Sequence, residues 1–314
     1  MCLNALQRQT LEPSTYEVIV VDDGSGDNTA SVTDRYAFAL ARVRLIKHST
    51  NRGLATARHT GASAAEGELI LFLDGDLRAS ENYLKTHVRM HESYPNEELV
   101  VVGDIFYNRE AMANSNFARF MNSRYLGQRS KKATRRIDFN NLPAIFCGGG
   151  LISLSRATYR NAGGFDQRFQ AYGAEDLEFA IRVLARGARA VFARGARVEH
   201  FDKADALRIR TKHTEMGYAM VKSLKKSDRR FLDSSTYRYL TPPEFGDRPL
   251  IVAVAKVLIR FVLNKPIRLL ITAWCLKTDT IAALYFPPIY LLALVSWFID
   301  GTRSEIFGNS KALY

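Results

Sequence analysis

Two carboxylates separated by one glycine, Asp74 and Asp76, directly follow the apolar run 68–73. Two acids this close repel each other, and binding a hard divalent cation such as Mg²⁺ or Mn²⁺ relieves the repulsion. Gly75 lets the backbone turn so that both side chains can face one ion. Because an Asp-x-Asp triplet also occurs as a solvated acidic turn, the rest of the chain must decide between the two interpretations.

Further acids and an arginine stand near the ends of other expected elements. Asp22 and Asp23 follow a strand expected at 16–21, where a carboxylate can accept hydrogen bonds from a base N–H or a ribose hydroxyl, or form an Asx turn. Arg58 stands on a helix expected at 54–65. Its guanidinium fork suits a diphosphate, although the spacing equally fits a helix-surface arginine.

The second half of the chain adds two acids and a histidine. Glu175 and Asp176 stand at the start of a helix expected to run to Arg186. A carboxylate there can act as a general base or cap the helix, and both roles can hold at once. His200 follows a short expected strand, where it is either a metal ligand or a packing residue.

Three consecutive glycines, Gly148, Gly149 and Gly150, interrupt the strand character of 145–155. A strand position without side chains suits the close approach of a ligand or of another backbone. These glycines are therefore a further candidate part of a binding site.

Strands and helices alternate over the region that carries most of these residues. Strands are expected at 16–21, 43–47 and 68–73, with helices at 29–40 and 54–65 between them. This alternation is typical of a doubly wound parallel sheet, whose ligands bind at the carboxyl ends of its strands. We therefore expect an α/β fold in which 68–73 is a central strand buried on both faces.

The motifs resemble, in order and spacing, those of family 2 of the nucleotide-sugar glycosyltransferases. The matching segments are Val20–Ser25, Asn51–Gly53 with Arg58, Glu66–Glu68 before Asp74–Asp76, and Gly163–Asp166 before Gly173–Asp176. They cover residues 1–202. The resemblance implies an inverting enzyme with the GT-A fold, a Rossmann-like, mostly parallel sheet with flanking helices.

The resemblance also implies roles for the donor-binding residues. It assigns Asp23, with Asp22 beside it, to the nucleotide base, and Arg58 to the diphosphate. Asp76 would hold a Mg²⁺ or Mn²⁺ ion, and Asp74 would contact the ribose or the metal. The ion would stabilise the negative charge that develops on the leaving nucleotide.

Three further assignments follow from the same resemblance. Asp176 matches the catalytic base of inverting members, and Glu175 would bind the acceptor. His200 stands where related enzymes often place a third metal ligand. Gly149 and Gly150 would form the floor of the donor-sugar pocket.

The start of the chain departs from the family pattern. Family members usually begin with an apolar strand that contacts the base, whereas residues 1–9 read as the end of an amphipathic helix. We expect either that about one strand is missing upstream or that the sheet is closed in another way. If the strand is absent, the nucleotide pocket lacks one wall.

The balance of charge and the cysteines limit the other possibilities. A net charge of +12 predicts a polyanionic partner: a nucleic acid, a phosphorylated ligand or an anionic lipid surface. The basic stretches carry no nucleic-acid motif and no interleaved aromatic residues, so we expect no nucleic-acid partner. Cys2, Cys147 and Cys275 are few and far apart, which favours reduced cytoplasmic cysteines over a disulfide framework.

The last third carries none of these motifs, and we divide it into a basic helical connector at 203–248 and an apolar helical region at 249–314. The stretch 281–299 has no charged residue but contains Pro287-Pro288, so it is a kinked spanning helix, an interfacial hairpin or a buried helix pair. The neighbouring basic residues favour membrane contact. We therefore expect an enzyme at the cytoplasmic face of a membrane.

The sequence thus predicts metal-dependent, inverting transfer of a sugar from a nucleoside diphosphate sugar, most simply UDP-linked, to a hydroxyl acceptor. A lipid-linked or cell-envelope glycan is the hypothetical acceptor. One alternative is a catalytically impaired protein that only binds or scaffolds. Another is a nucleotidyltransferase, which would normally need a glycine-rich, basic phosphate loop that the first residues do not contain.

Overall fold

The computed structural model describes residues 1–36, 42–131, 137–170, 173–201, 205–224 and 250–306. Residue contacts divide the chain into two compact units. The first unit comprises residues 1–108, 123–170 and 175–202, and the second comprises 109–122, 171–174 and 203–314. Most of the connector expected at 203–248 lies outside the described residues, which give only its first helix.

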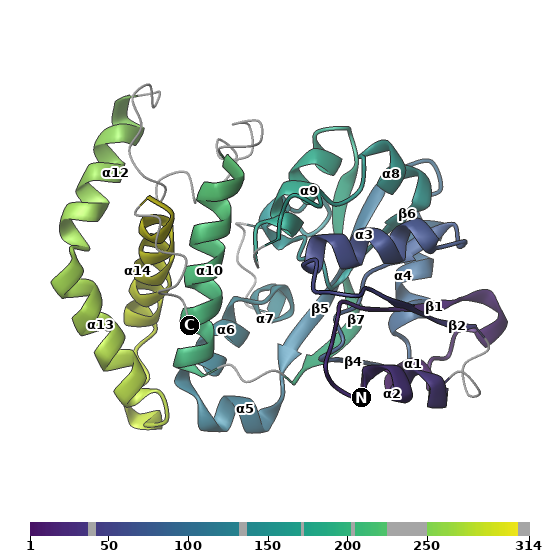
Figure 1. Ribbon diagram of the computed structural model, residues 1–314, viewed down its shortest axis with the longest axis horizontal. Helices are drawn as coiled ribbons and strands as arrows, with labels where there is room; N and C mark the ends of the chain where they lie inside the picture. Colours follow the sequence, from purple (N-terminus) through teal and green to yellow (C-terminus); the bar gives the residue numbers. More distant parts are fainter. Residues whose placement is uncertain (37–41, 132–136, 171–172, 202–204, 225–249, 307–314) are drawn as a thin grey trace. The chain divides into compact units, whose positions relative to one another are not determined.

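The first unit contains the strands and the helices that cover them (Figure 1). The strands are β1 Val18–Asp22, β2 Val43–Lys47, β3 Leu69–Leu71, β4 Leu77–Ala79, β5 Leu99–Tyr107, β6 Ile152–Ser155 and β7 Arg189–His200. The helices are α1 Cys2–Leu6, η1 Pro13–Thr15, α2 Thr29–Tyr36, α3 Leu54–Ala64, α4 Tyr83–Glu92, α7 Leu126–Lys131, η2 Ala144–Phe146, α8 Arg156–Asn161 and α9 Glu175–Leu184.

The described strands form two sheets. β1 and β2 pair in parallel, and a five-stranded sheet has the order β3-β6-β5-β7-β4. Within the five-stranded sheet only β5 and β7 are parallel, whereas β3–β6, β6–β5 and β7–β4 are antiparallel. The predicted mostly parallel sheet is therefore wrong in this part, where the fold is mixed α/β. The alternation of strands and helices that favours parallel pairing ends at β3, and apolar runs do not encode strand direction.

β3 also differs from the expected central strand. Its hydrogen bonds to other described strands go to β6 alone, in the register Leu69 with Ser155 and Leu71 with Ser153. Ile70 is buried, whereas Leu69 and Leu71 are only half-buried. The strand that is buried on both faces is β5, in which Leu99 to Val102 are almost fully excluded from solvent.

Small residues bring α3 close to the two-stranded sheet. Gly61 lies so near β1 that an added Cβ would be 3.3 Å from Val21 Cγ2. Ala55 and Ala62 on the same helix are buried. A helix without bulky side chains on its inner face can pack closely on a strand, and this packing fixes the position of Arg58.

The second unit is helical in its described part. Its elements are α5 Arg109–Asn114, α6 Asn116–Arg124 (of which 116–122 belong to this unit), α10 Ala206–Leu224, α12 Leu250–Val262, α13 Lys265–Thr278, η4 Ala282–Leu284 and α14 Pro287–Ile306. α14 packs along α10 with almost no side chain between the two backbones. A Cβ on Gly217 would lie 2.2 Å from the Phe298 carbonyl oxygen, and one on Gly301 would lie 1.9 Å from that of Thr214.

The uncharged stretch 281–299 is not one continuous helix. It contains η4 and most of α14, and Pro287-Pro288 begins α14 instead of kinking it, because the first turn of a helix tolerates proline. Trp297 is fully buried and donates a hydrogen bond from Nε1 to Thr272 Oγ1 (2.9 Å). None of the helices described in the structure has both the length and the apolar character needed to cross a bilayer.

Asp279, just after α13, joins three segments of the second unit. Its buried carboxylate accepts hydrogen bonds from Ser115 Oγ (3.0 and 3.1 Å), from the Phe117 N–H (2.8 Å) and from the Ala206 N–H (2.9 Å). A buried charge with several donors is stable where an unpaired one would not be. Asp279 therefore stabilises the packing of α6, α10 and α13.

Candidate active site

Asp74 and Asp76 lie in the short connection between β3 and β4. The backbone of this connection is held by a hydrogen bond from the Leu77 N–H to the Asp74 carbonyl oxygen (3.2 Å). The side chains of both acids are more than two-fifths exposed, at 42% and 44%. Both carboxylates are therefore accessible to a ligand.

Arg58 connects Asp74 to the second pair of predicted site residues. Its Nη2 donates to Asp74 Oδ1 and its Nη1 to Glu175 Oε1, each at 3.0 Å. The side chains of Arg58 and Glu175 are only 9% and 3% exposed. Burial lowers the pKa of Arg58, but the charges of Asp74, Glu175 and Asp176 outweigh burial and raise this pKa above its ordinary value.

This bridge changes the expected role of the arginine. In the structure the Arg58 guanidinium faces two carboxylates, with its Cζ also 5.5 Å from the centre of the Phe165 ring. A cation held between two acids orients both of them. Arg58 thus positions Asp74 and Glu175, while its predicted contact with a diphosphate stays a prediction.

The three glycines lie against the same charged group. A Cβ on Gly149 would be 2.6 Å from Arg58 Nη1, and one on Gly150 would be 2.1 Å from Asp74 Oδ2. The Gly149 N–H donates to Asp176 Oδ2 (3.3 Å). The sequence predicted close approach of a ligand or of another backbone at these glycines, whereas in the structure the side chains of Arg58 and Asp74 occupy the space beside Gly149 and Gly150.

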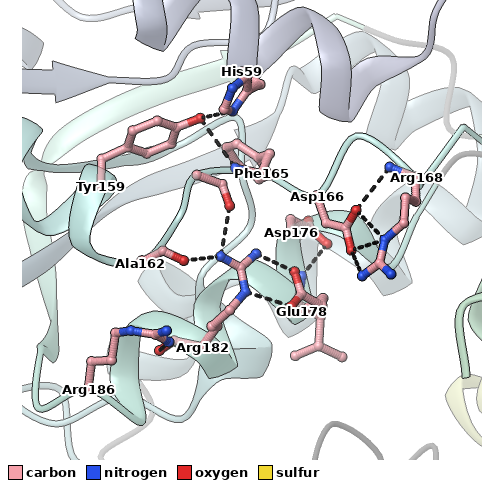
Figure 2. A network of polar contacts seen from close by, with 12 residues as sticks. His59, Tyr159, Ala162, Phe165, Asp166, Arg168, Asp176, Glu178, Arg182 and Arg186 are labelled. Atoms are coloured by element: carbon pink, nitrogen blue, oxygen red, sulfur yellow. Dashed lines mark hydrogen bonds and ion pairs between the residues drawn. The ribbon is translucent and has the colours of Figure 1, made fainter. Parts of the chain in front are cut away.

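Asp176 is in the first turn of α9 and accepts a hydrogen bond from the Leu177 N–H on Oδ1 (2.7 Å). A polar network around Arg182, in the last turn of α9, joins this helix to the turn that precedes it (Figure 2). Arg182 pairs with Glu178 one turn earlier and also donates to the carbonyl oxygens of Ala162 and Gly164 (2.8 Å for Gly164). This network ties the Gly163–Asp166 turn to the helix that carries Asp176.

His200 lies beside Asp76, and both are predicted metal ligands. The two residues come from β7 and from the turn before β4, which pair so that His200 is opposite Leu77. His200 Nε2 is 3.5 Å from Asp76 Oδ2, and Tyr107 contacts the imidazole edge to face at 5.1 Å between ring centres.

The side chains of Asp76 and His200 have the chemistry of ligands for a divalent cation. A carboxylate oxygen and an imidazole nitrogen are both common ligands of Mn²⁺ and related ions, and the Asp76 side chain is accessible. Among the described residues, however, no three His, Cys, Asp or Glu side chains gather into one metal-binding group. In the structure Asp76 lies beside His200, whereas Asp74 pairs with Arg58.

Asp23 forms a separate cluster with the end of β2. Its carboxylate accepts from the N–H groups of Arg52 (3.0 Å) and Gly53 (2.8 Å), and its Oδ1 is 2.6 Å from His48 Nδ1. Burial raises the pKa of Asp23, but the hydrogen bonds from His48, Arg52 and Gly53 outweigh burial and hold this pKa below its ordinary value. Asp22 accepts from the Ser25 N–H (2.8 Å), as in an Asx turn.

Sequence reasoning missed His48 as a partner of Asp23. The sequence signal was the position of His48 directly after the strand expected at 43–47. This strand lies next to the strand that ends at Asp22. Neighbouring parallel strands bring their carboxyl ends together, so a polar residue after each is a candidate contact.

The match to a protein family covers the residues of this site. Residues 1–159, just over half of the chain, match the model for glycosyl transferase family 2. The chain belongs to this family. Residues 128–213 also match a model described as the N-terminal domain of galactosyltransferase. Between them, these matches contain every candidate residue from Asp22 to His200.

Curated relatives of this family 2 chain are similar over part of their length. Validoxylamine A glucosyltransferase of Streptomyces hygroscopicus subsp. limoneus is 28% identical over 206 residues, which are 59% of this chain and 44% of the relative. Polypeptide N-acetylgalactosaminyltransferase 12 of Mus musculus is 32% identical over 185 residues, which are 54% of this chain and 31% of the relative. The chain spans less than half the length of each.

Solved structures with the same fold extend over nearly the whole chain. The mannosyltransferase PcManGT from Pyrobaculum calidifontis superposes with a TM-score of 0.58 at 18% identity, covering 98% of this chain and 83% of that one. TarS of S. aureus superposes with a TM-score of 0.51 at 15% identity, covering 99% and 88%. The family 2 chain therefore has the mixed α/β fold of these glycosyltransferases, which supports the implied GT-A fold but not the mostly parallel sheet.

Proposed function

We propose that the chain transfers a sugar from a nucleoside diphosphate sugar to a hydroxyl acceptor, with inversion at the anomeric carbon and with Mg²⁺ or Mn²⁺ as cofactor. The observation that carries this proposal is the Arg58 bridge. It places Asp74, the first acid of the predicted donor site, beside Glu175 and the predicted base Asp176. Family membership and the fold support the same conclusion.

The ligands of the structural neighbours support a nucleotide-sugar donor. PcManGT was solved with GDP-Man and Mn²⁺, and TarS with UDP-GlcNAc. We infer a nucleoside diphosphate sugar for this chain as well, and UDP is the first nucleotide to test. Asp23 would accept hydrogen bonds from the base, and Gly149 and Gly150, which make room for the Arg58 and Asp74 side chains, would lie at the floor of the donor-sugar pocket.

Asp76 and His200 would hold the divalent cation, with Asp74 close by in sequence. The cation would supply positive charge to the diphosphate as it leaves. Arg58 keeps the carboxylates of Asp74 and Glu175 in a fixed geometry, so Glu175, whose side chain is only 3% exposed, would act by holding Arg58 and Asp74 in place.

Asp176 would act on the acceptor. Its carboxylate takes the proton of the attacking hydroxyl while the new bond forms between the acceptor oxygen and the anomeric carbon. The bond from that carbon to the diphosphate oxygen breaks in the same step, and the nucleoside diphosphate leaves with the electron pair. A single displacement from the opposite face inverts the configuration.

The acceptor is proposed to be a lipid-linked or cell-envelope glycan, presented at the cytoplasmic face of a membrane. The apolar helices of the second unit support this choice.

A donor screen followed by a transfer assay tests the proposal. UDP- and GDP-sugars are added with Mn²⁺, and a bound donor raises the melting temperature because it stabilises the native state. The stabilising donor is then incubated with candidate acceptors, and release of nucleoside diphosphate is measured. Stabilisation without release would favour the catalytically impaired binding protein, and release of pyrophosphate from a nucleoside triphosphate would favour a nucleotidyltransferase.

Two variants assign the roles within the site. Asp176→Asn is expected to lower transfer at least about 10³-fold while the donor still raises the melting temperature, because the base contacts the acceptor and not the nucleotide. Asp76→Asn is expected to remove the dependence of donor binding on Mn²⁺. Normal transfer by the Asp176 variant would contradict its assignment as the base.

A further inference from the structure

The polarity of α12 is reversed relative to that of a helix on the surface of a soluble protein. Lys256 is only 3% exposed, and Arg260, one turn later, is half-buried. Burial, with further contributions from the charges of Arg303 and Arg268, lowers the pKa of Arg260 to about 10. The charged side of α12 is therefore turned toward the protein.

The opposite side of α12 is apolar and exposed to solvent. Val254, Val257, Leu258 and Phe261 are spaced three and four residues apart and so form one stripe. All four are exposed, Phe261 to 77%. A surface helix normally shows its polar side to water and its apolar side to the core, so this arrangement calls for an apolar environment outside the protein.

The exposed apolar surface continues along the next elements. Figure 1 shows α12 and α13 following one another in the second unit. On α13, Leu269 and Leu270 are exposed, Leu270 to 70%, and Leu284 and Phe286 are exposed at and after η4. We refer to the exposed residues of these three elements as the apolar face: Val254, Val257, Leu258, Phe261, Val262, Ile267, Leu269, Leu270, Leu276, Ile281, Leu284 and Phe286.

The charges around the apolar face are mainly basic, although Asp300, whose side chain is 40% exposed, pairs with the buried Arg268 of α13. The only acid between 253 and 299 is Asp279, which is buried and satisfied within the second unit. Lys265 and Lys277, near the two ends of α13, are exposed. An apolar surface flanked by exposed lysines, next to which the Asp300 carboxylate is paired with Arg268, complements an anionic surface. A second copy of the same face would bring like charges together.

The lengths of the two helices indicate whether they could cross a bilayer or only lie on its surface. α12 has 13 residues and α13 has 14, so each extends about 20 Å, whereas a bilayer core is about 30 Å thick. On α12 the charged side is buried in the protein, and on α13 the buried side contains Arg268 together with Ile271 and Cys275. Short amphipathic helices lie in the plane of the interface, with their apolar side at the boundary of headgroups and acyl chains.

We propose that the apolar face of α12, α13 and η4 binds the surface of an anionic lipid bilayer, with Phe261 and Leu270 entering the lipid and Lys265 and Lys277 contacting the headgroups. The role of this binding in catalysis rests on the proposed function, because the enzyme would meet a lipid-linked acceptor at the surface of a bilayer. The binding itself involves no sugar transfer and is tested without it.

Flotation with vesicles tests the proposal. The full chain is mixed with vesicles of phosphatidylcholine alone, or of phosphatidylcholine with about one-third phosphatidylglycerol, and centrifuged through a density gradient. We expect flotation with the anionic vesicles and at least about tenfold less of it after Phe261→Ser with Leu270→Ser, because two large exposed apolar side chains are removed. Lys265→Glu with Lys277→Glu is expected to remove the preference for phosphatidylglycerol.

A matched control separates the face from apolar surface in general. Leu207 on α10 is 60% exposed but lies outside the apolar face, so Leu207→Ser should leave flotation unchanged. Thermal unfolding checks that every variant is folded, and the nucleotide-sugar screen above reports on the donor site independently. Absence of flotation for the folded chain would overturn the proposal, as would a lipid-free dimer that Phe261→Ser with Leu270→Ser converts to monomer. Flotation without donor binding would contradict the proposed function alone.

Discussion

Glycines make close contacts possible in both units, but the partners differ. In the first unit, Gly149 and Gly150 make room for charged side chains, those of Arg58 and Asp74. In the second unit, Gly217 and Gly301 make room for the backbone of the facing helix. The first arrangement lies in the accessible candidate active site, and the second holds two helices together. A substitution should therefore affect activity in one unit and stability in the other.

Gly301→Ala is expected to have the largest effect on stability. Its Cβ would lie 1.9 Å from the Thr214 carbonyl oxygen, so α10 and α14 must separate. We expect a loss of about 3 kcal/mol in the free energy of unfolding, at the upper end of overpacking effects. Denaturation in urea measures this loss. Gly26, which has no neighbour within 4 Å of an added Cβ, provides the control, and an equal loss in Gly26→Ala would refute the explanation.

Gly150→Ala is expected to reduce activity more than stability. The new methyl group would lie 2.1 Å from Asp74 Oδ2, but the Asp74 side chain is partly exposed and can move outward. Displacing a site carboxylate by about 1 Å is expected to cost about 10²-fold in kcat/KM, with little change in melting temperature. Steady-state kinetics and thermal unfolding of the same preparation make the comparison. If stability fell and kcat/KM did not, the contrast between the two units would fail.

Asp279→Asn tests whether charge also contributes to the second unit. The asparagine keeps the shape but loses the charge that strengthens the bonds from the Ser115 hydroxyl and the N–H groups of Phe117 and Ala206. We expect a loss of about 2 kcal/mol in the free energy of unfolding, measured in urea. Unchanged stability would mean that close packing alone holds these segments.

The pH dependence of stability tests a buried polar cluster in the first unit. His87 Nδ1 and His91 Nε2 lie 2.8 and 3.0 Å from Ser153 Oγ, and burial lowers the pKa of His87 to about 3 and that of His91 to about 4. The unfolded chain binds protons near pH 6.5, whereas the folded chain does not. Stability is therefore complete above pH 6.5 and falls as the pH drops toward 3, by about 1.4 kcal/mol per pH unit for His87.

Urea denaturation at pH 7.5, 6 and 5 measures this slope. His87→Gln should make the slope shallower by about one proton, since glutamine does not titrate. A variant with the slope of the unchanged chain would show that other groups cause the acid sensitivity.

Local patterns were enough to find most of the candidate site. Asp74 and Asp76 were recognisable because they follow an apolar run, and Asp176 because it begins an amphipathic helix. The glycines were recognisable because three in a row are rare inside a strand, although the strand expected at 145–155 is confirmed only at 152–155 and the glycines lie in the turn before it. Each of these signals lies within a few residues of chain. The opposing directions of the strands gave no such signal, because an apolar run has the same pattern in either direction.

The amino-acid sequence by itself determined which residues can do chemistry, the family to which the chain is similar, and the placing of Lys256 and Arg260 on one side of a helix. Only the tertiary structure decided that Arg58 bridges Asp74 to Glu175, which lies 117 residues after Arg58, and that the charged side of α12 faces inward. The physical reason is the same in both cases. Periodicity tells which residues share a face, whereas long-range packing decides what that face meets and whether it is buried.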